Sequence, residues 1–166
     1  DVARARRLLA EAGYPNGFDG GVISSDMVYA SLAEAVANYL GPVGIRLKVA
    51  PMERAAILLA NQEKKLRGLN VGGSAAFGNA ATRIEAYVAA GGLYTYGHHA
   101  DIEGLFQEQA AEADKKRREA TLHRIQQLMH ERAMFAPVWN IASLNAYGPR
   151  VAESGLGLIT NYLFSA

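Results

Sequence analysis

The stretch from Gly68 to Arg83, GLNVGGSAAFGNAATR, combines small residues with groups that could hold a small molecule. Gly73 and Ser74 follow a short apolar run that is long enough for a buried strand. Asn79 is a suitable helix N-cap, and the free amide groups after it could hold a carboxylate or another anion. Because α/β folds bind ligands beyond the carboxyl ends of their strands, the pattern predicts a binding loop. A plain connection, packed tightly for steric reasons, is the alternative.

Four aromatic residues follow or flank loops rather than lying in helix stripes: Phe77, Tyr94, Tyr96 and Trp139. Aromatic side chains in such places often wall a ligand cleft, although a small hydrophobic cluster beneath a loop would give the same pattern. The predicted ligand-binding residues are therefore Gly73, Ser74, Phe77, Asn79, Tyr94, Tyr96 and Trp139.

Motifs for catalysis or for resident metals are weak in this sequence. His98 and His99 stand beside Asp101, but adjacent histidines on an extended loop point apart and no further ligand is close in the sequence. The glycines before Ser74 lack the Gly-Lys-Ser/Thr ending of a phosphate loop, and neither GxSxG nor HExxH occurs. We therefore predict a protein that is not an enzyme and has no metal site and no cofactor.

Composition limits the class of protein further. The chain has 166 residues, of which 50% are hydrophobic and 20% charged, which is typical of a globular domain with a substantial core. The net charge of +1 gives no support to a nucleic-acid partner. The absence of cysteine excludes disulfides, zinc thiolate sites and cysteine nucleophiles. No run reaches transmembrane length, and the start at Asp1 leads us to expect an excised or processed segment.

Helices and strands alternate in the first half of the chain, which predicts parallel strands joined by right-handed crossovers. The expected strands are 18–25, 44–49 and 69–71, and the expected helices are 2–12, 28–40 and 52–66. The strand around Gly20 is expected in the centre of the sheet. Residues 45–49 alternate strictly between apolar and basic side chains, which indicates a strand near a sheet edge with one face exposed to solvent.

The second half is mainly helical and ends in loops. We expect helices over 79–90, 101–113 and 114–134, with Asp101 and Asp114 as N-caps of the last two. The segment Pro137–Ile141 is expected to be a strand. After Tyr147 the chain becomes loop-rich, and its apolar tail has no obvious partner within this sequence.

Three segments resemble a known family when they are read in this order and spacing. They are Arg4–Phe18, the helix from Ala30 with Gly44–Val49, and the helices from Asp101 to Met129 that end in Ala136-Pro137-Val138. The chain is similar to the C-terminal lobe segment of family 5 extracellular solute-binding proteins, the peptide/nickel-binding type of ABC importers. The resemblance covers nearly the whole chain.

The resemblance implies an α/β fold, namely one lobe of a type II periplasmic-binding-protein-like fold, three-layered and with a mostly parallel sheet. It implies that residues 1–146 form the lobe and that 147–166 form a hinge and return segment toward a missing N-terminal lobe. It also implies a periplasmic or extracellular protein that encloses a peptide or small polar solute between two lobes and delivers it to a membrane permease.

In peptide-binding members of that family, the loop after the third strand carries a tryptophan and an aspartate that takes the peptide's amino group. The matching region here has Phe77 as the aromatic residue and no acidic residue. A neutral Asn79 cannot pair with an ammonium ion as a buried carboxylate would. The resemblance therefore leaves room for another polar solute.

Two other hypotheses remain. One is a small α/β enzyme with an unrecognised site, which would need a cluster of titratable groups with perturbed pKa values in a pocket. The other is an interaction domain that self-associates through an exposed apolar surface, including a dimer that forms only because the lobe is excised.

Overall fold

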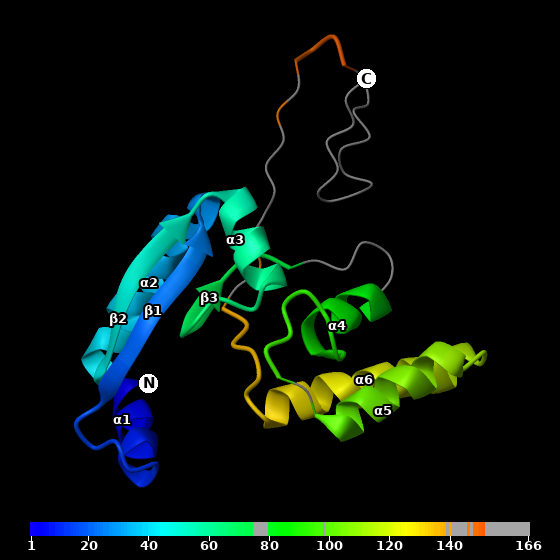
Figure 1. Cartoon of the computed structure of the whole chain (residues 1–166), viewed down its shortest axis with the longest axis horizontal. Coiled ribbons are helices and arrows are strands. Elements are labelled where there is room, and N and C mark those ends of the chain that lie inside the picture. The colour runs from blue at the N-terminus through cyan, green and yellow to red at the C-terminus, as the bar shows by residue number, and fades with distance from the viewer. Residues whose placement is uncertain (75–79, 98, 139, 141–145, 147, 152–166) are drawn as a thin grey trace. The chain divides into compact units, whose positions relative to one another are not determined.

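The computed structural model describes residues 1–74, 80–97, 99–138, 140, 146 and 148–151 (Figure 1). The chain divides into two compact units, Asp1–Gly73 and Ser74–Ala166. No helix in these described ranges is both long enough and apolar enough to cross a membrane.

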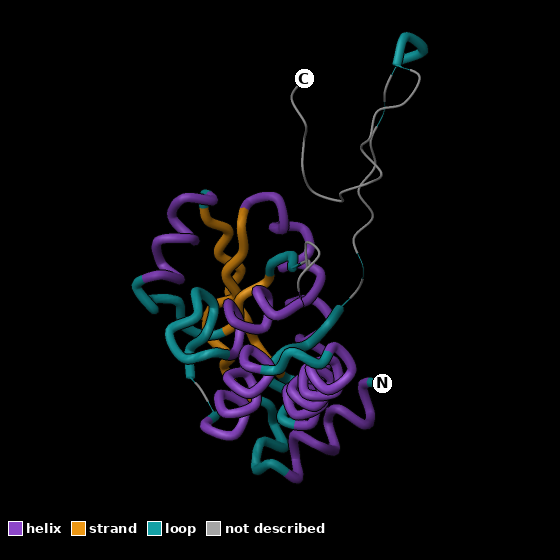
Figure 2. The backbone as a smooth tube through the Cα atoms, turned by 90° about the vertical axis from the view of Figure 1, so that its right-hand side faces the viewer, coloured by secondary structure: helices purple, strands orange, loops and turns teal. Residues whose placement is uncertain are grey.

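The first unit is an alternating helix and strand arrangement. Its elements are α1 (Val2–Glu11), β1 (Phe18–Asp26), the 3-10 helix η1 (Met27–Tyr29), α2 (Ala30–Leu40), the 3-10 helix η2 (Gly41–Val43), β2 (Ile45–Met52), α3 (Arg54–Gln62) and β3 (Leu69–Val71). The three strands lie side by side (Figure 2). They are parallel in the order β2-β1-β3, so the predicted central position of β1 and the predicted edge position of β2 are confirmed.

The strand order also places the helices. The chain moves from β1 to β2 in one direction and from β2 past β1 to β3 in the other. Because both crossovers of parallel strands are right-handed, α2 and α3 cover opposite faces of the sheet. The result is a layer of helix on each face, with the central strand buried between them: Ile23 and Ser25 of β1 are fully buried.

Local signals set the boundaries of α1. The Asp1 side chain accepts a hydrogen bond from the Arg4 amide at 2.9 Å, as expected of an N-cap. At the other end Gly13 takes a left-handed conformation with φ +90°, and the Tyr14 amide donates to the Leu9 carbonyl at 2.8 Å. The predicted helix and its predicted glycine stop are therefore confirmed.

Gly17 and Gly44 approach each other closely, just before the first residue pair of β1 and β2. Gly17 has φ +72°, and a Cβ atom built on it would lie 1.9 Å from the Gly44 carbonyl oxygen. The same carbonyl accepts a hydrogen bond from the Phe18 amide at 3.0 Å, and Phe18 pairs with Ile45. Only a residue without a side chain at position 17 allows this approach.

Three helix boundaries in this unit differ from the prediction by two residues or more. The helix α2 begins at Ala30 rather than Val28, because Met27–Tyr29 form a 3-10 turn whose Val28 amide is capped by Asp26. The helix α3 begins at Arg54 rather than Met52, because β2 continues to Met52. It ends at Gln62 rather than Leu66, since the left-handed conformation of Lys64, with φ +55°, cannot continue a helix.

The described part of the second unit consists of the helices α4 (Ala80–Val88), α5 (Ala100–Ala111) and α6 (Lys115–Glu131). They share one hydrophobic core, whose buried members are Ile84, Val88, Ile102, Ile125 and Leu128. Asp114 is the predicted N-cap of α6, and its side chain accepts a hydrogen bond from the Arg117 amide at 2.9 Å.

The predictions of one N-cap, one helix end and one strand in this unit are wrong. Asp101 is not the N-cap of α5: His99 holds that position, and Asp101 lies in the first turn, where it pairs with Arg132. The helix α6 ends at Glu131 because Ala133 is left-handed, with φ +48°. Pro137 and Val138 are not in a strand, whereas part of that predicted strand lies outside the described residues.

Candidate functional site

An ion pair joins the carboxyl end of the central strand to the start of α3. Asp26 is the last residue of β1, and its Oδ2 accepts a hydrogen bond from Arg54 Nη1 at 3.2 Å. The Asp26 side chain is 12% exposed, whereas that of Arg54 is 75% exposed. A carboxylate that is buried to this degree needs a charged or hydrogen-bonding partner, so Asp26 fixes one end of an otherwise solvent-facing guanidinium.

A second contact at the same edge joins η1 to the end of β3. Gly73 follows β3, and a Cβ atom built on it would lie 2.3 Å from the Tyr29 hydroxyl oxygen. The Tyr29 phenol therefore rests on the backbone of Gly73, and any side chain at position 73 would displace it. We call Asp26, Tyr29, Arg54 and Gly73 the edge cluster.

The strand end beneath the edge cluster is polar and buried. Ser24 and Ser25 have exposed fractions of 4% and 0%, and the Ser25 hydroxyl makes no hydrogen bond in the described structure. By contrast, Met27 and Val28 of η1 are 51% and 73% exposed. The carboxyl edge of the sheet thus offers a carboxylate, a guanidinium, a phenol, exposed backbone and two apolar side chains, a mixture of groups that is common in small-molecule sites.

The predicted binding residues fall into three groups. Gly73 belongs to the first unit and to the edge cluster, and Ser74, which follows it, is exposed. Tyr94 and Tyr96 belong to the second unit, whereas Gly73 belongs to the first, so neither unit contains all three residues. The others lie outside the described residues: Phe77, Asn79 and Trp139.

Tyr94 belongs to an aromatic cluster in the second unit. Its ring stacks on that of Tyr87 with 4.7 Å between centroids, and Tyr87 meets Phe135 edge-on at 5.5 Å. This is the packing that a hydrophobic cluster beneath a loop predicts. Tyr96 is exposed. A role of either tyrosine in binding stays a prediction.

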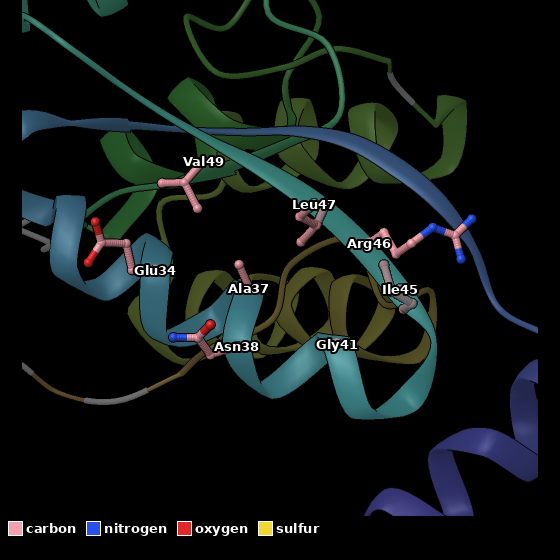
Figure 3. Close-up of a pocket in the computed structure, with 8 residues that line it drawn as sticks. All are labelled: Glu34, Ala37, Asn38, Gly41, Ile45, Arg46, Leu47 and Val49. Atoms are coloured by element: carbon pink, nitrogen blue, oxygen red, sulfur yellow. The ribbon is translucent and has the colours of Figure 1, made fainter.

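A hollow of about 500 Å³ lies in the first unit between α2 and the edge strand β2. Figure 3 shows Leu47 facing Ala37 across it, with Glu34 near one end and Arg46 directed away. The hollow is lined by Glu34, Ala37, Asn38, Gly41, Ile45, Arg46, Leu47 and Val49. Its lining includes no predicted site residue and no member of the edge cluster, so we treat it as the seam where α2 packs on the sheet.

The second unit carries a bidentate ion pair on its surface. Arg132 donates from Nη1 to Asp101 Oδ1 at 3.0 Å and from Nη2 to Asp101 Oδ2. These hydrogen bonds lower the pKa of Asp101 from 3.8 to about 2 and raise that of Arg132. Both groups face solvent, so the pair links α5 to the end of α6 and supplies no catalytic acid or base.

Sequence reasoning missed three members of the edge cluster: Asp26, Tyr29 and Arg54. A usable signal was present, because Ser24-Ser25-Asp26 puts three polar residues at the end of an otherwise apolar central strand. Polar residues at that end of a parallel strand lie where α/β folds bind ligands. The partner residues gave no such signal.

Comparison with solved structures gives the fold. The chain is similar to the periplasmic binding protein DppA from Helicobacter pylori, solved in complex with the peptide STSA. The match covers 80% of this chain and 27% of DppA, at TM-score 0.68 and 22% identity. This chain has the fold of one lobe of an ABC-transporter solute-binding protein. The predicted fold class is therefore confirmed.

Two further solute-binding proteins match equally well. AgaA from A. tumefaciens R10, in complex with agropinic acid, is matched over 78% of this chain and 28% of its own, at TM-score 0.65 and 23% identity. NikA from Staphylococcus aureus, with Ni(L-His)2, is matched over 77% of this chain and 29% of its own, at TM-score 0.66 and 15% identity. The chain thus spans under a third of these proteins. No protein-family model and no curated protein matches its sequence.

Proposed function

We propose that this chain is the C-terminal lobe of the solute-binding component of an ABC transporter. The observation that carries the proposal is the match of nearly four fifths of the chain to several solute-binding proteins of this kind. Those proteins carry the peptide STSA, agropinic acid and Ni(L-His)2 in their solved structures, so the fold serves several solutes. The solute here is a peptide or another small polar molecule.

Binding takes place between this lobe and a second lobe encoded elsewhere in the parent protein. Residues 1–146 form the lobe, and 147–166 lead back through the hinge. The solute closes the hinge only through its higher affinity for the closed state. The edge cluster of the first unit would contact the solute, and the residues predicted from the sequence stay candidates for further contacts: Gly73, Ser74, Phe77, Asn79, Tyr94, Tyr96 and Trp139.

The parent protein would work outside the cytoplasmic membrane, in the periplasm or on the cell surface, and would deliver its solute to a membrane permease. The names of the matched periplasmic proteins support this location. A chain of this length alone should bind its solute poorly, because one wall gives only part of the enclosure.

Native mass spectrometry of the full-length parent protein, purified gently from its own compartment, tests the proposal. An additional discrete mass that is lost on unfolding is the expected result, and its composition would identify the class of solute. Tight binding of that solute by residues 1–166 alone would contradict a cleft shared by two lobes.

An enzyme is the weaker alternative. It would need titratable groups with perturbed pKa values gathered in a pocket. The shifted pair Asp101–Arg132 is instead exposed on a helical surface. Self-association through an exposed apolar surface is the third hypothesis, and sedimentation of the 166-residue chain over a range of concentrations would detect such a dimer.

A further inference from the structure

The edge cluster contains an arginine whose hydrogen-bonding capacity is only partly used. Among the residues that the structure describes, the Arg54 side chain donates through Nη1 alone, to one carboxylate oxygen of Asp26. The bidentate ion pair in the second unit is different, because two nitrogens of Arg132 donate hydrogen bonds to the two carboxylate oxygens of Asp101. A guanidinium has five N–H groups in a planar fork, so the Nε–Nη2 side of Arg54 retains its capacity for a second carboxylate.

Burial explains why this arginine is positioned rather than merely present on the surface. Asp26 lies at the end of the buried central strand, and its side chain is 12% exposed. Its Oδ1 also accepts a hydrogen bond from the Val28 amide at 3.3 Å, which fixes the carboxylate from a second side. The anchor is rigid, so the Arg54 side chain loses less rotamer entropy when an anion binds than a free surface arginine would.

The position of the fork matters as much as its chemistry. Arg54 begins α3 just beyond the carboxyl end of β2, and its contact with Asp26 places it at the carboxyl end of β1. In open α/β sheets this edge is where small molecules bind. At the same edge, the Tyr29 phenol lies against the backbone of Gly73 and offers an aromatic surface.

We propose that Arg54, anchored by Asp26, binds a carboxylate group of the solute through its Nε–Nη2 side. The proposal rests on the proposed solute-binding function and narrows it to a solute with at least one carboxylate. Such a group could be the C-terminus of a peptide or part of a small organic acid, and both would be recognised by the same fork.

One neighbouring charge opposes this binding and supplies a second test. Glu53 precedes Arg54, is exposed and gives no side-chain hydrogen bond to the first turn of α3. Its carboxylate would repel an anion at Arg54. Removal of that charge should therefore strengthen carboxylate binding, whereas removal of the Arg54 charge should weaken it.

The experiment is an NMR titration of the ¹⁵N-labelled 166-residue chain at constant ionic strength. Three probes are used: propionate, N-acetyl-Ala-Ala, and N-acetyl-Ala-Ala amide, which lacks the carboxylate. The Arg54 Nε–H signal and the amide signals of Arg54 and Ala55 report binding. We expect saturable shifts with both acids at about millimolar concentration and none with the amide. Tighter binding of the acetylated dipeptide than of propionate would indicate a peptide carboxylate.

The variants separate recognition from general charge. Arg54→Gln should weaken binding of the acids by about tenfold or more, and Arg54→Lys should do so nearly as strongly because it keeps the charge but loses the fork. Glu53→Gln should tighten binding about twofold. Arg46→Gln is the matched control, because it removes an exposed arginine of the same unit that lies outside the edge cluster.

Two results would overturn the inference: equal shifts with the acid and the amide, or unchanged carboxylate binding by Arg54→Gln. Arg54 is largely exposed, so these variants should fold, and their amide spectra verify this directly. Native mass spectrometry of the parent protein stands apart from this test. A bound solute there, together with a failed titration here, would reject the carboxylate site and leave the solute-binding function in place.

Discussion

Three glycines of the first unit should respond to the same substitution in opposite directions. Gly41 has φ −51°, within the range of any residue, and a Cβ atom on it meets nothing within 4 Å. Gly13 also has open space but has φ +90°. Gly17 combines φ +72° with a Cβ position 1.9 Å from the Gly44 carbonyl oxygen. The series therefore separates chain entropy, backbone conformation and steric overlap.

The magnitudes follow from these three terms. Gly41→Ala should stabilise the unit by about 0.4–1 kcal/mol, because alanine restricts the unfolded chain without strain in the folded one. Gly13→Ala should cost about 1–2 kcal/mol for the left-handed conformation. Gly17→Ala pays that cost and adds about 1–3 kcal/mol of overpacking, for a total of about 2–5 kcal/mol. The overlap is with backbone that the Phe18 hydrogen bond holds in place, so it cannot be relieved by a rotamer change.

Native-state hydrogen exchange at the Ile23 amide is the suitable assay, because Ile23 is fully buried in the central strand and reports the opening of the first unit alone. Protection should rise for Gly41→Ala, fall for Gly13→Ala and fall furthest for Gly17→Ala. Equal effects of the substitutions at 13 and 17 would refute the close approach of Gly17 to Gly44.

Three further predictions concern the second unit. Ile125→Ala should cost about 2–5 kcal/mol of unfolding free energy in urea denaturation, because Ile125 is fully buried in the helical core. Asp114→Ala should cost about 1 kcal/mol, and loss of protection at the Arg117 amide would locate the effect at the cap. The stabilisation from Asp101 should be present above its unfolded pKa of about 3.8 and be lost as the pH falls toward about 2. Carboxyl NMR should show the pKa of Asp101 returning toward 3.8 in Arg132→Gln, and an unchanged midpoint would contradict the pair.

Much of the first unit could be predicted because its signals are local. Strict alternation from Ile45 to Val49 identified a strand, and the helix-strand order identified the parallel sheet with β1 in its centre. Gly13 and Asp1 marked the ends of α1. The strand and the ends of α1 depend on residues within a few positions of one another, and the sheet follows from the order of these elements along the chain.

The edge cluster depends on contacts that no local pattern encodes. Asp26 and Arg54 are 28 positions apart and meet only because two strands end at the same edge. Tyr29 reaches Gly73 for the same reason. The start of α2 was predicted at Val28, whereas the Asp26 side chain caps Met27–Tyr29 in a tighter 3-10 turn. A helix pattern alone does not separate a 3-10 turn from the first turn of an α-helix.

The division of the chain at Gly73 has a consequence for the order in which it folds. In the first unit every strand pair joins segments separated by a complete crossover, since Ile23 pairs with both Val49 and Leu69. In the second unit α5 and α6 are neighbours in sequence and pack through a short connection. Chain closure over long segments is slow and closure between adjacent helices is fast. During synthesis the sheet can be completed only after β3 has emerged from the ribosome, whereas the helical unit can form almost as soon as α6 is available, so the part made last need not be the last to fold.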